Sequence, residues 1–328
     1  MTSIVALVTA IALLFGGSGP AAAQNAPDEG DSKSLRDVLE AASKGHIEAK
    51  AKLDNSKKRQ GELTAQFDSV QARLTSLTDE VGLMAAESYR LGRLTSVTLL
   101  LNSASPENML ERAAGLEVIA QREGRNLQAL AEAHEQAARA KAAIDNEVRE
   151  QEKQVTIMAR KKQDAQRALA AVSTGPSGGV VSANSAAANP APRNSDGSWP
   201  SESCNVDDPT TSGCITPRTL HAMNQAKAAG FTKFVSCFRN GGSGEHPKGR
   251  ACDFSAEAGG FKERDATGDN RTYGNNLAGY YVNNADRLGV LYVIWYRQIW
   301  MPGVGWSSYN GGGSPAGDHT NHVHLSML

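Results

Sequence analysis

Two long segments of this chain carry a spacing of hydrophobic residues that is typical of an α-helical coiled coil. From residue 35 to about residue 100, apolar or small residues recur at alternating intervals of four and three, beginning with Leu35, Leu39 and Ala42. The same spacing returns over residues 127–172. It places one stripe of side chains on the face that a supercoiled helix turns toward its partner. We therefore expect two long helices that pack against each other.

A helix break lies between these two segments. Asn102-Ser-Ala-Ser-Pro106 combines turn residues, a capping serine and a proline suited to the first turn of the next helix. The simplest fold for residues 31–172 is an antiparallel coiled-coil hairpin. Its seam contains Ala, Ser, Gln and Lys, so we expect weak packing between the arms.

Around the predicted tip, the narrow seam widens into general apolarity. The residues concerned are Leu91, Leu94, Val97, Leu99, Leu100, Leu101, Met109, Leu110, Leu116, Val118 and Ile119. This is more apolar surface than an isolated two-helix tip buries. It indicates a site for a partner protein, or alternatively a small local helical bundle folded back on itself.

The N-terminus, residues 1–23, reads as a secretory signal peptide. The apolar run Ile4–Phe15 is followed by Ala21-Ala22-Ala23, which fits an A-x-A cleavage site. The run is shorter than the roughly 20 apolar residues that span a bilayer. We expect cleavage after Ala23 and a secreted, extracytoplasmic protein; a retained membrane tether is the alternative.

The rest of the chain divides into a linker and a second domain. Residues 173–202 are rich in Gly, Ser, Ala, Asn and Pro and lack the apolar content needed for order, which predicts a flexible linker. Residues 203–328 show strand and helix patterns of an α+β domain with an antiparallel sheet. The whole chain has 328 residues, enough for about two domains. Its net charge of -1 gives no electrostatic reason for binding nucleic acid.

All four cysteines, Cys204, Cys214, Cys237 and Cys252, lie in this second domain. An even number confined to one exported module predicts two disulfides. Three pairings are possible. We favour Cys204 with Cys214 and Cys237 with Cys252, because these pairs are close in sequence and the second would hold the loop between them at both ends. A cysteine-based zinc site would need a C-x-x-C spacing, which the sequence lacks.

Within that loop, His246 and Asp253 stand in the pattern His-x-x-Gly-x-Ala-x-Asp, and a His-x-His follows at His322 and His324. Residues i and i+2 on a strand leave the same face, so both late histidines can approach one ion. Gly249 allows the loop to turn so that His246 reaches the strand that carries Asp253. Two nitrogens and one oxygen suit a catalytic zinc, whose fourth position is kept for water. Unrelated surface and core histidines are the alternative.

These two motifs resemble those of the LAS metallopeptidases, the group with lysostaphin-type enzymes, D-alanyl-D-alanine metallopeptidases and the hedgehog domain. More narrowly, Cys204–Leu328 resembles a C-terminal domain of secreted actinobacterial proteins, and that likeness rests on Cys214–Arg218, Gly241–His246 and Val293–Trp300. The resemblance implies a hedgehog or D-Ala-D-Ala peptidase-like fold.

By the same resemblance, His246, Asp253 and His324 are zinc ligands. His322 matches a catalytic base or oxyanion stabiliser. His319 extends the motif to His-x-x-His-x-His, as in penicillin-insensitive murein endopeptidases, and would be a second proton-transfer residue.

The chain also departs from this pattern. D-alanyl-D-alanine carboxypeptidases place a catalytic glutamate three residues before the last zinc histidine, where this chain has Asn321. An amide is no general base, so a histidine-based endopeptidase mechanism is favoured. Arg239 could anchor a substrate carboxylate as a bidentate fork, or form a surface or structural ion pair.

The helical region resembles exported coiled-coil murein hydrolases and hydrolase activators, most clearly over residues 87–112. In those families, the coiled coil docks on an FtsEX-like division transporter or holds the enzyme inactive. The sequence thus predicts a secreted, cell-wall-associated zinc peptidase that cleaves amide bonds of peptidoglycan stem peptides. Two alternatives are a non-catalytic zinc-binding cell-wall protein that regulates or positions other murein hydrolases, and a purely structural or adhesive exported protein.

Overall fold

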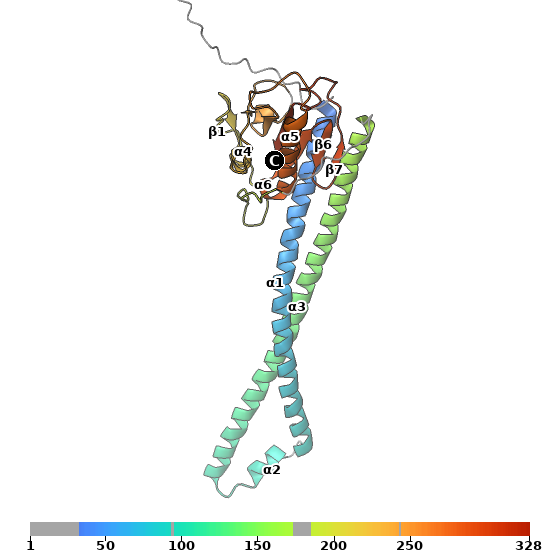
Figure 1. The fold of residues 1–328 in the computed structure, drawn as a ribbon. Coiled ribbons are helices and arrows are strands. Elements are labelled where there is room, and N and C mark those ends of the chain that lie inside the picture. The colour runs from blue at the N-terminus through green and yellow to red at the C-terminus, as the bar shows by residue number, and fades with distance from the viewer. Residues whose placement is uncertain (1–32, 93–94, 173–184, 243) are drawn as a thin grey trace, which may run out of the picture.

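The computed structural model describes residues 33–92, 95–172, 185–242 and 244–328. A long helical hairpin carries an α+β domain at one end (Figure 1). This is the multidomain architecture that the sequence predicted. The predicted signal peptide, residues 1–23, lies outside the described residues. Among the described helices, none is long and apolar enough to cross a membrane.

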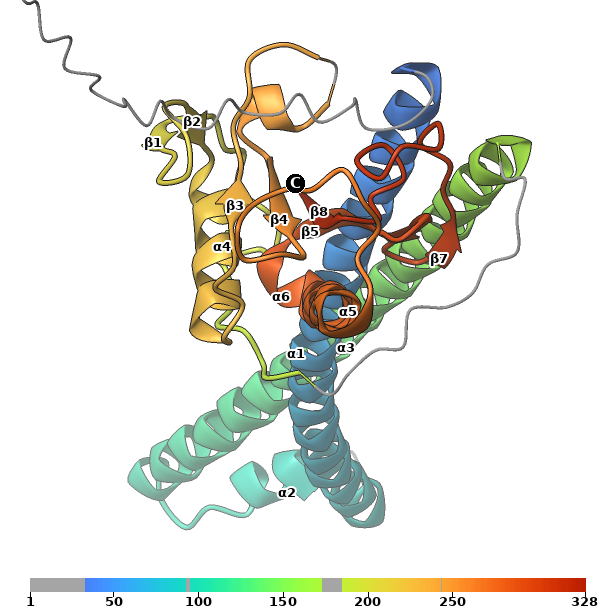
Figure 2. The ribbon, with the colours of Figure 1, turned by 45° about the horizontal axis from the view of Figure 1, so that its top comes forward.

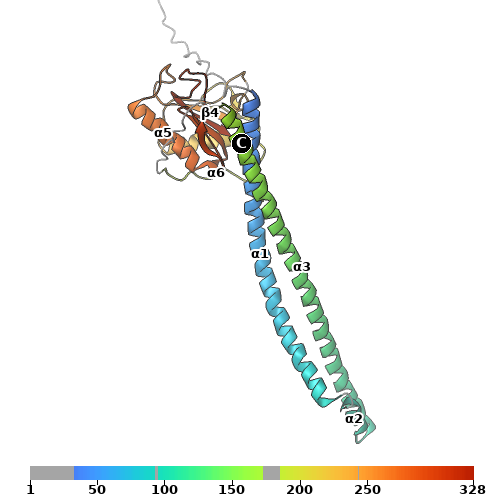
Figure 3. The same ribbon diagram turned by 90° about the vertical axis from the view of Figure 1, so that its right-hand side faces the viewer.

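The hairpin is built from two long helices and one short helix. They are α1 (Lys33–Leu91), α2 (Thr95–Leu101) and α3 (Pro106–Val172). Figure 3 shows α1 and α3 running side by side from the domain toward the tip, and Figure 2 shows them diverging near the tip, where α2 lies. The arms are antiparallel, as the heptad spacing predicted.

The helix break before Pro106 falls where the sequence predicted it. The Ser105 hydroxyl accepts a hydrogen bond from the backbone N–H of Asn108 at 3.3 Å and so caps α3. The first arm is shorter than expected, because α1 ends at Leu91 instead of continuing to about residue 100. Gly92 adopts a left-handed φ of 75°, a conformation that commonly ends a helix.

Small and polar side chains fill much of the seam between the arms. Leu74 packs against Ala133 and Ala137 in one apolar cluster. Closer to the domain, Ser56 is fully buried and donates a hydrogen bond to the Glu147 carboxylate at 2.6 Å. Such contacts fix the pairing of the arms while burying little apolar area, in line with the predicted seam.

The domain is organised around a six-stranded antiparallel sheet in the order β3-β4-β8-β5-β6-β7. These strands are β3 (Val235–Ser236), β4 (Ala251–Ser255), β5 (Val290–Trp295), β6 (Gln298–Met301), β7 (Gly305–Ser308) and β8 (His322–Met327). A separate two-stranded sheet pairs β1 (Val206–Asp207) with β2 (Cys214–Ile215). Strands that are distant in sequence, β4 and β8, are therefore neighbours at the centre of the sheet.

Helices cover one face of the large sheet. They are α4 (Pro217–Ala228), α5 (Gly268–Asn283) and α6 (Ala285–Leu288). The helix α4 begins at a capping threonine followed by a proline: the Thr216 hydroxyl accepts a hydrogen bond from the backbone N–H of Thr219. Phe254, Trp295 and Leu325 point from the strands into the core beneath these helices, each at most 1% exposed. The alternate residues of the same strands therefore face the opposite side.

The domain contains two disulfides, Cys204–Cys214 and Cys237–Cys252. These are the pairs that the sequence favoured. The second joins the residue after β3 to the second residue of β4 and so closes the loop that contains His246 at both ends. This bond holds the loop next to the sheet.

Residues 185–202, which the sequence placed in a flexible linker, pack against the domain. The Asn284 side-chain oxygen accepts from the backbone N–H of Ala188 at 2.8 Å, and the Gln225 side chain does the same for Asn189. Ala188 and Ala191 are 3% exposed. Amide side chains of the domain satisfy this segment's backbone, which its low apolar content does not reveal. The predicted linker residues 173–184 lie outside the described residues.

The second face of the sheet is covered by the base of the hairpin, which we define as residues 35–56 and 158–170. A shared apolar cluster joins Leu39, Ala42, Ala165 and Leu169 of the hairpin to Leu291, Tyr292, Ile294, Ile299 and Met301 of the domain. The Ser43 hydroxyl also donates to the backbone oxygen of Leu291 at 2.6 Å. Figure 2 shows α1 and α3 beside the sheet. The sheet is thus enclosed by domain helices on one face and by the hairpin base on the other.

Candidate metal centre

The register of two central strands brings the predicted metal ligands together. In the antiparallel pair β4 and β8, Asp253 lies opposite His324, and Ser255 lies opposite His322. Residues directly opposite each other in such a pair share a face of the sheet. Asp253, His322 and His324 therefore point to the same side, which is the face covered by the hairpin base.

His246 reaches this face from a short 3₁₀ turn, His246–Lys248, that ends at Gly249. Gly249 adopts a left-handed φ of 68°, and a Cβ atom there would lie 2.8 Å from the Ile215 Cα. Only glycine fits this turn. The Nδ1–H of His246 donates to the backbone oxygen of Cys237, which places Nε2 at 3.1 Å from Asp253 Oδ2.

The third ligand candidate meets the same carboxylate from the other side. His324 Nδ1 lies 2.8 Å from Asp253 Oδ1, and its Nε2 lies 2.7 Å from the Ser326 hydroxyl. One potential ligand atom from each of His246, Asp253 and His324 lies within 4.8 Å of the others, and all three residues are buried. Two imidazole nitrogens and a carboxylate oxygen form a donor set that binds divalent transition metals. The group can therefore hold a metal ion.

His322 and His319 lie beside this group. His322 Nε2 is 3.5 Å from Asp253 Oδ1, while its Nδ1 is 2.7 Å from the side-chain oxygen of Asn321. The ring of His319 is 4.6 Å from that of His322, measured between centroids. The two histidines that the resemblance marked for proton transfer are thus neighbours at the candidate centre.

His319 is held in an unusual backbone conformation. Its φ is 53°, in the left-handed region, and its Nδ1–H donates to the Gly317 oxygen at 2.8 Å. The backbone N–H of Tyr296, in the turn after β5, donates to the His319 oxygen at 2.9 Å. A left-handed φ at a non-glycine residue costs free energy, and such residues cluster at functional sites.

Burial controls protonation of the site. Burial alone raises the pKa of Asp253, but the imidazoles of His246 and His322 outweigh it and hold that pKa well below its ordinary value. For His322, burial lowers the pKa to about 4, against the opposing effect of the Asp253 carboxylate. Burial also lowers the pKa of His319 well below 6.5, with a further contribution from His322. At neutral pH, the carboxylate is charged and His319 and His322 are neutral, each with one ring nitrogen able to accept a proton.

Arg239 lies against the ligand group. Its Nη1 is 3.4 Å from Asp253 Oδ2, and its side chain is 26% exposed. The structure therefore shows the structural ion pair that was the alternative to substrate binding. An anchoring role toward a substrate carboxylate would require this pair to rearrange.

Next to His246, four charged residues link the loop to the hairpin base; we call Glu40, Glu245, Lys248 and Arg250 the charge cluster. Glu245 is fully buried, 2.8 Å from Lys248 Nζ and 2.5 Å from Arg250 Nε. Glu40 of α1 meets Arg250 Nη2 at 2.9 Å and Lys248 Nζ at 3.4 Å. Burial raises the pKa of Glu245. The loop that positions His246 is therefore tied to α1 by charge-assisted hydrogen bonds.

The residues of the candidate centre are buried. His246, Asp253, His319, His322 and His324 are each at most 3% exposed. The ring of Tyr292, which contacts the hairpin base, also stacks on that of His324 at 5.6 Å. The sequence patterns did not indicate that Glu40 or Tyr292 would lie near the candidate centre. For Glu245, the one sequence signal was its position directly before His246.

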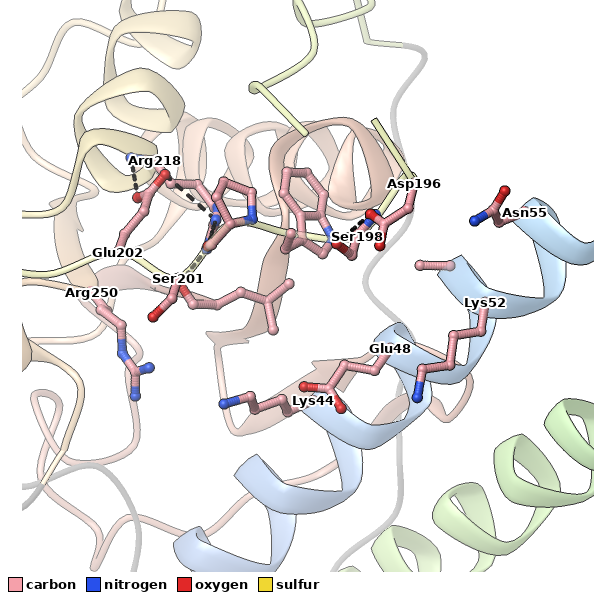
Figure 4. Close-up of a pocket in the computed structure, with 14 residues that line it drawn as sticks. Lys44, Glu48, Lys52, Asn55, Asp196, Ser198, Ser201, Glu202, Arg218 and Arg250 are labelled. Atoms are coloured by element: carbon pink, nitrogen blue, oxygen red, sulfur yellow. Dashed lines mark hydrogen bonds and ion pairs between the residues drawn. The ribbon is translucent and has the colours of Figure 1, made fainter. Parts of the chain in front are cut away.

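A cavity of about 440 Å³ lies elsewhere along the boundary between α1 and the domain. Figure 4 shows Lys44 and Glu48 extending from α1 on one side and Ser201 and Arg250 on the other. Groups of both charge signs line it, and none of the five centre residues does. The boundary between hairpin and domain is thus open at this cavity, away from the five centre residues.

Comparisons with known proteins cover part of the domain. A family model described as the VldE C-terminal domain matches residues 211–320. This stretch includes His246, Asp253 and His319 and ends just before β8, so the match does not reach His322 or His324. No curated protein matches the chain. The similarity concerns one third of the chain, and the description of the family names no activity.

Proposed function

We propose that the chain is a secreted zinc-dependent peptidase, most simply an endopeptidase, that hydrolyses amide bonds in the stem peptides of peptidoglycan. The observation that carries this proposal is the buried group His246, Asp253 and His324 with the neutral His322 beside it. A metal ligand set next to a group that can accept a proton is the arrangement required for metal-assisted hydrolysis. We also propose that the domain is related to the LAS metallopeptidases.

Zinc fits the donor set because two imidazoles and one carboxylate leave a coordination position open. When bound, zinc supplies Lewis acidity and a water whose pKa is lowered toward about 7. His246 suits this role because its Nδ1–H is held by a backbone oxygen, which orients Nε2. The Asp253 carboxylate is charged before metal arrives, since its pKa is held low.

The proton transfers fall to the two neighbouring histidines. His322 is neutral at pH 7, so a ring nitrogen can take the proton of the attacking water and return it to the leaving amine. His319, whose ring lies 4.6 Å from that of His322, is the second candidate for this work. Asn321 stands where a carboxylate would act in the carboxypeptidases, and an amide takes no part as a base. These residues favour a histidine-based mechanism.

The hairpin base covers the face that a substrate must reach, so we propose that it regulates access. Displacing Leu39 and Glu40 of α1 would uncover the histidines while leaving the sheet register unchanged. The exposed apolar residues at the far tip, Leu101, Leu110 and Ile119, are the proposed contact with an FtsEX-like membrane transporter. The two disulfides and the signal-like segment support an extracytoplasmic, cell-wall-associated location.

A second function has its own supporting observation. The centre residues are at most 3% exposed, and no side-chain carboxylate other than the ligand Asp253 contacts His322 among the described residues. These features also suit a non-catalytic zinc-binding domain that regulates or positions other murein hydrolases. Fold and metal do not by themselves establish turnover.

Digestion of purified peptidoglycan sacculi separates the two functions. The full chain is incubated with sacculi and zinc, and released muropeptides are identified by mass spectrometry. A Glu40→Arg variant, which opposes Arg250 and Lys248 with a like charge, should release more product than the wild type. An Asp253→Asn variant should release none, and His134→Gln, at an exposed hairpin histidine, should match the wild type. Zinc-loaded Glu40→Arg protein that creates no new peptide termini would sink the peptidase proposal.

A further inference from the structure

We propose that Asn321 is a positioning residue that sets the tautomer of His322, so that Nε2 of this histidine, and not Nδ1, is the nitrogen that accepts a proton. The inference rests on the proposed function for its catalytic meaning, but its geometry stands by itself. Asn321 lies between a backbone oxygen on one side and the imidazole on the other.

The first step is the orientation of the amide. Asn321 Nδ2 lies 2.6 Å from the backbone oxygen of Lys262. A carbonyl oxygen only accepts hydrogen bonds, so the NH₂ group must face it. Flipping the amide would set two oxygens against each other at that distance. Asn321 is 4% exposed, so water does not offer a competing partner.

The backbone around Asn321 is fixed as well. The backbone N–H of Ala256 donates to the Asn321 oxygen at 3.0 Å, and that of Ala266 donates to the Thr320 oxygen at 2.8 Å. Lys262 belongs to the loop between these two donors. The loop and the start of β8 are therefore clamped together, and the side chain of Asn321 has little freedom to choose another partner.

The second step is the tautomer of the histidine. With its NH₂ group committed to Lys262, Asn321 presents Oδ1 to His322 Nδ1 at 2.7 Å. That oxygen only accepts, so Nδ1 must carry the proton. In a neutral imidazole, Nε2 is then the unprotonated nitrogen. Asp253 does not compete for that proton, because its Oδ1 lies 3.5 Å from Nε2, beyond a good hydrogen bond.

The same rule holds for two neighbouring histidines. Nδ1–H donates to the Cys237 oxygen in His246 and to the Gly317 oxygen in His319. In these cases a backbone oxygen sets the tautomer directly, whereas for His322 a backbone oxygen acts through the Asn321 amide. His324 differs, since its Nδ1 faces Asp253. The centre therefore has three histidines that present Nε2 and one that presents Nδ1.

An amide fits position 321 better than a carboxylate does. An aspartate at position 321 would still accept from His322 but could not donate to Lys262, and would bring a second oxygen to 2.6 Å from that carbonyl. The amide is the side chain that satisfies both neighbours at once. Asn321 thus positions His322 through a hydrogen bond and does not stand in for a missing general base.

The test is the nitrogen NMR spectrum of the full chain, labelled with ¹⁵N-histidine and kept free of metal at pH 7.5. The His322 signals are identified by their loss in a His322→Gln variant. We expect Nδ1 at a protonated and Nε2 at an unprotonated chemical shift. In Asn321→Leu, which keeps the size but removes both hydrogen bonds, the two shifts should move toward each other as the second tautomer becomes populated.

Asn284→Leu is the matched control, because Asn284 is also a buried asparagine of this domain, 3% exposed, whose side chain both accepts and donates hydrogen bonds. It should leave the His322 shifts unchanged. A protonated Nε2 in the wild type, or unchanged shifts in Asn321→Leu, would overturn the proposal. If Asn321→Leu does not fold, the wild-type spectrum alone decides. No activity is measured, so the tautomer can prove right even if sacculi are not cleaved.

Discussion

The two ends of the hairpin both carry many apolar residues but differ in how far these residues are buried. At the base, Leu39 and Leu169 are 6% and 5% exposed, because the domain packs against them. At the tip, Leu101 and Leu110 are 79% and 72% exposed. A heptad spacing predicts that one face of a helix will be buried, but it does not predict which surface buries it. In this chain, the domain itself supplies the surface at one end only.

Polar contacts follow the same division. At the base, Glu40 meets two cations of the domain and Ser43 meets the backbone of β5. Toward the tip, Arg112 donates a hydrogen bond to the backbone oxygen of Asn102, and Asn126 donates one to Glu80, both within the hairpin. The base is thus tied to the domain, whereas these contacts near the tip join parts of the hairpin to each other.

The largest contrast is expected from shortening one leucine at each end. Leu39→Ala should lower the free energy of unfolding by about 2–5 kcal/mol, because truncating this buried leucine side chain leaves a cavity. Leu110→Ala should change it by less than about 0.5 kcal/mol, as is usual for an exposed site. Urea denaturation of both full-length variants measures this. Equal losses at the two ends would show that the base is not packed as described.

Lowering the pH should decrease the free energy of unfolding of the domain. The pKa of His322 is 6.5 as its ordinary value and about 4 in the folded protein, so the unfolded chain binds a proton first as the pH falls. Above pH 6.5, His322 is neutral in both the folded and the unfolded chain, so it does not change the free energy of unfolding. Between pH 6.5 and about 4, only the unfolded chain binds the proton, and the free energy of unfolding falls. At pH 5, the loss from this residue is about 2 kcal/mol relative to pH 7.5.

The measurement is denaturation of the metal-free protein at pH 7.5 and pH 5.0. The decrease in unfolding free energy between them should be about 2 kcal/mol smaller in His322→Asn than in the wild type. Only the difference between the two pH values is compared, so a general loss of stability in the variant does not affect the result. An identical decrease in both proteins would contradict the lowered pKa.

Loosening the charge cluster should make the centre accessible. Glu40→Gln removes the hairpin's charge from Lys248 and Arg250, at a cost of about 1 kcal/mol, since the pair is partly exposed to solvent. That cost corresponds to about a fivefold increase in the open population. Metal uptake by the apoprotein should accelerate by the same factor in stopped-flow experiments.

Glu80→Gln is the control for that experiment, because Glu80 forms its contacts with Asn126 and Arg122, which are both residues of the hairpin. It should leave metal uptake at the wild-type rate. If Glu80→Gln and Glu40→Gln accelerate uptake alike, opening is a property of the whole hairpin and not of its base.

The smallest effect is expected at the tip. Leu101→Ser combined with Ile119→Ser removes exposed apolar side chains, 79% and 54% exposed, without touching a packed cluster. The melting temperature should stay within a degree or two of the wild type, while the fluorescence of a bound hydrophobic dye decreases. A large drop in melting temperature would favour the small local bundle that the sequence left open.

Much of this arrangement could be predicted from the sequence where local chemistry decides it. The proline and serine before α3, the cysteine spacing and the i, i+2 histidines each act over a few residues. The early end of α1 was missed because Gly92 is one residue within a continuing heptad pattern. The packing of residues 185–202 was missed because side chains from elsewhere satisfy their backbone.

The candidate centre shows the same limit. The sequence predicted that His246, Asp253 and His324 converge, since strand periodicity and Gly249 determine where they point. It did not predict that Glu40 contacts Lys248 and Arg250 next to this group, because the heptad spacing carries no information about a distant surface. Arg239 was predicted near the centre, but its partner in the structure is Asp253.

The most direct test of the central claim is the metal content of the full chain. Protein dialysed against zinc and then freed of excess should contain one ion per chain by inductively coupled plasma mass spectrometry. Asp253→Asn and His324→Gln should lose it, and His134→Gln, on the exposed face of the hairpin, should retain it. A wild-type chain that holds no zinc, or an Asp253→Asn chain that holds as much as the wild type, would contradict a metal centre at these residues.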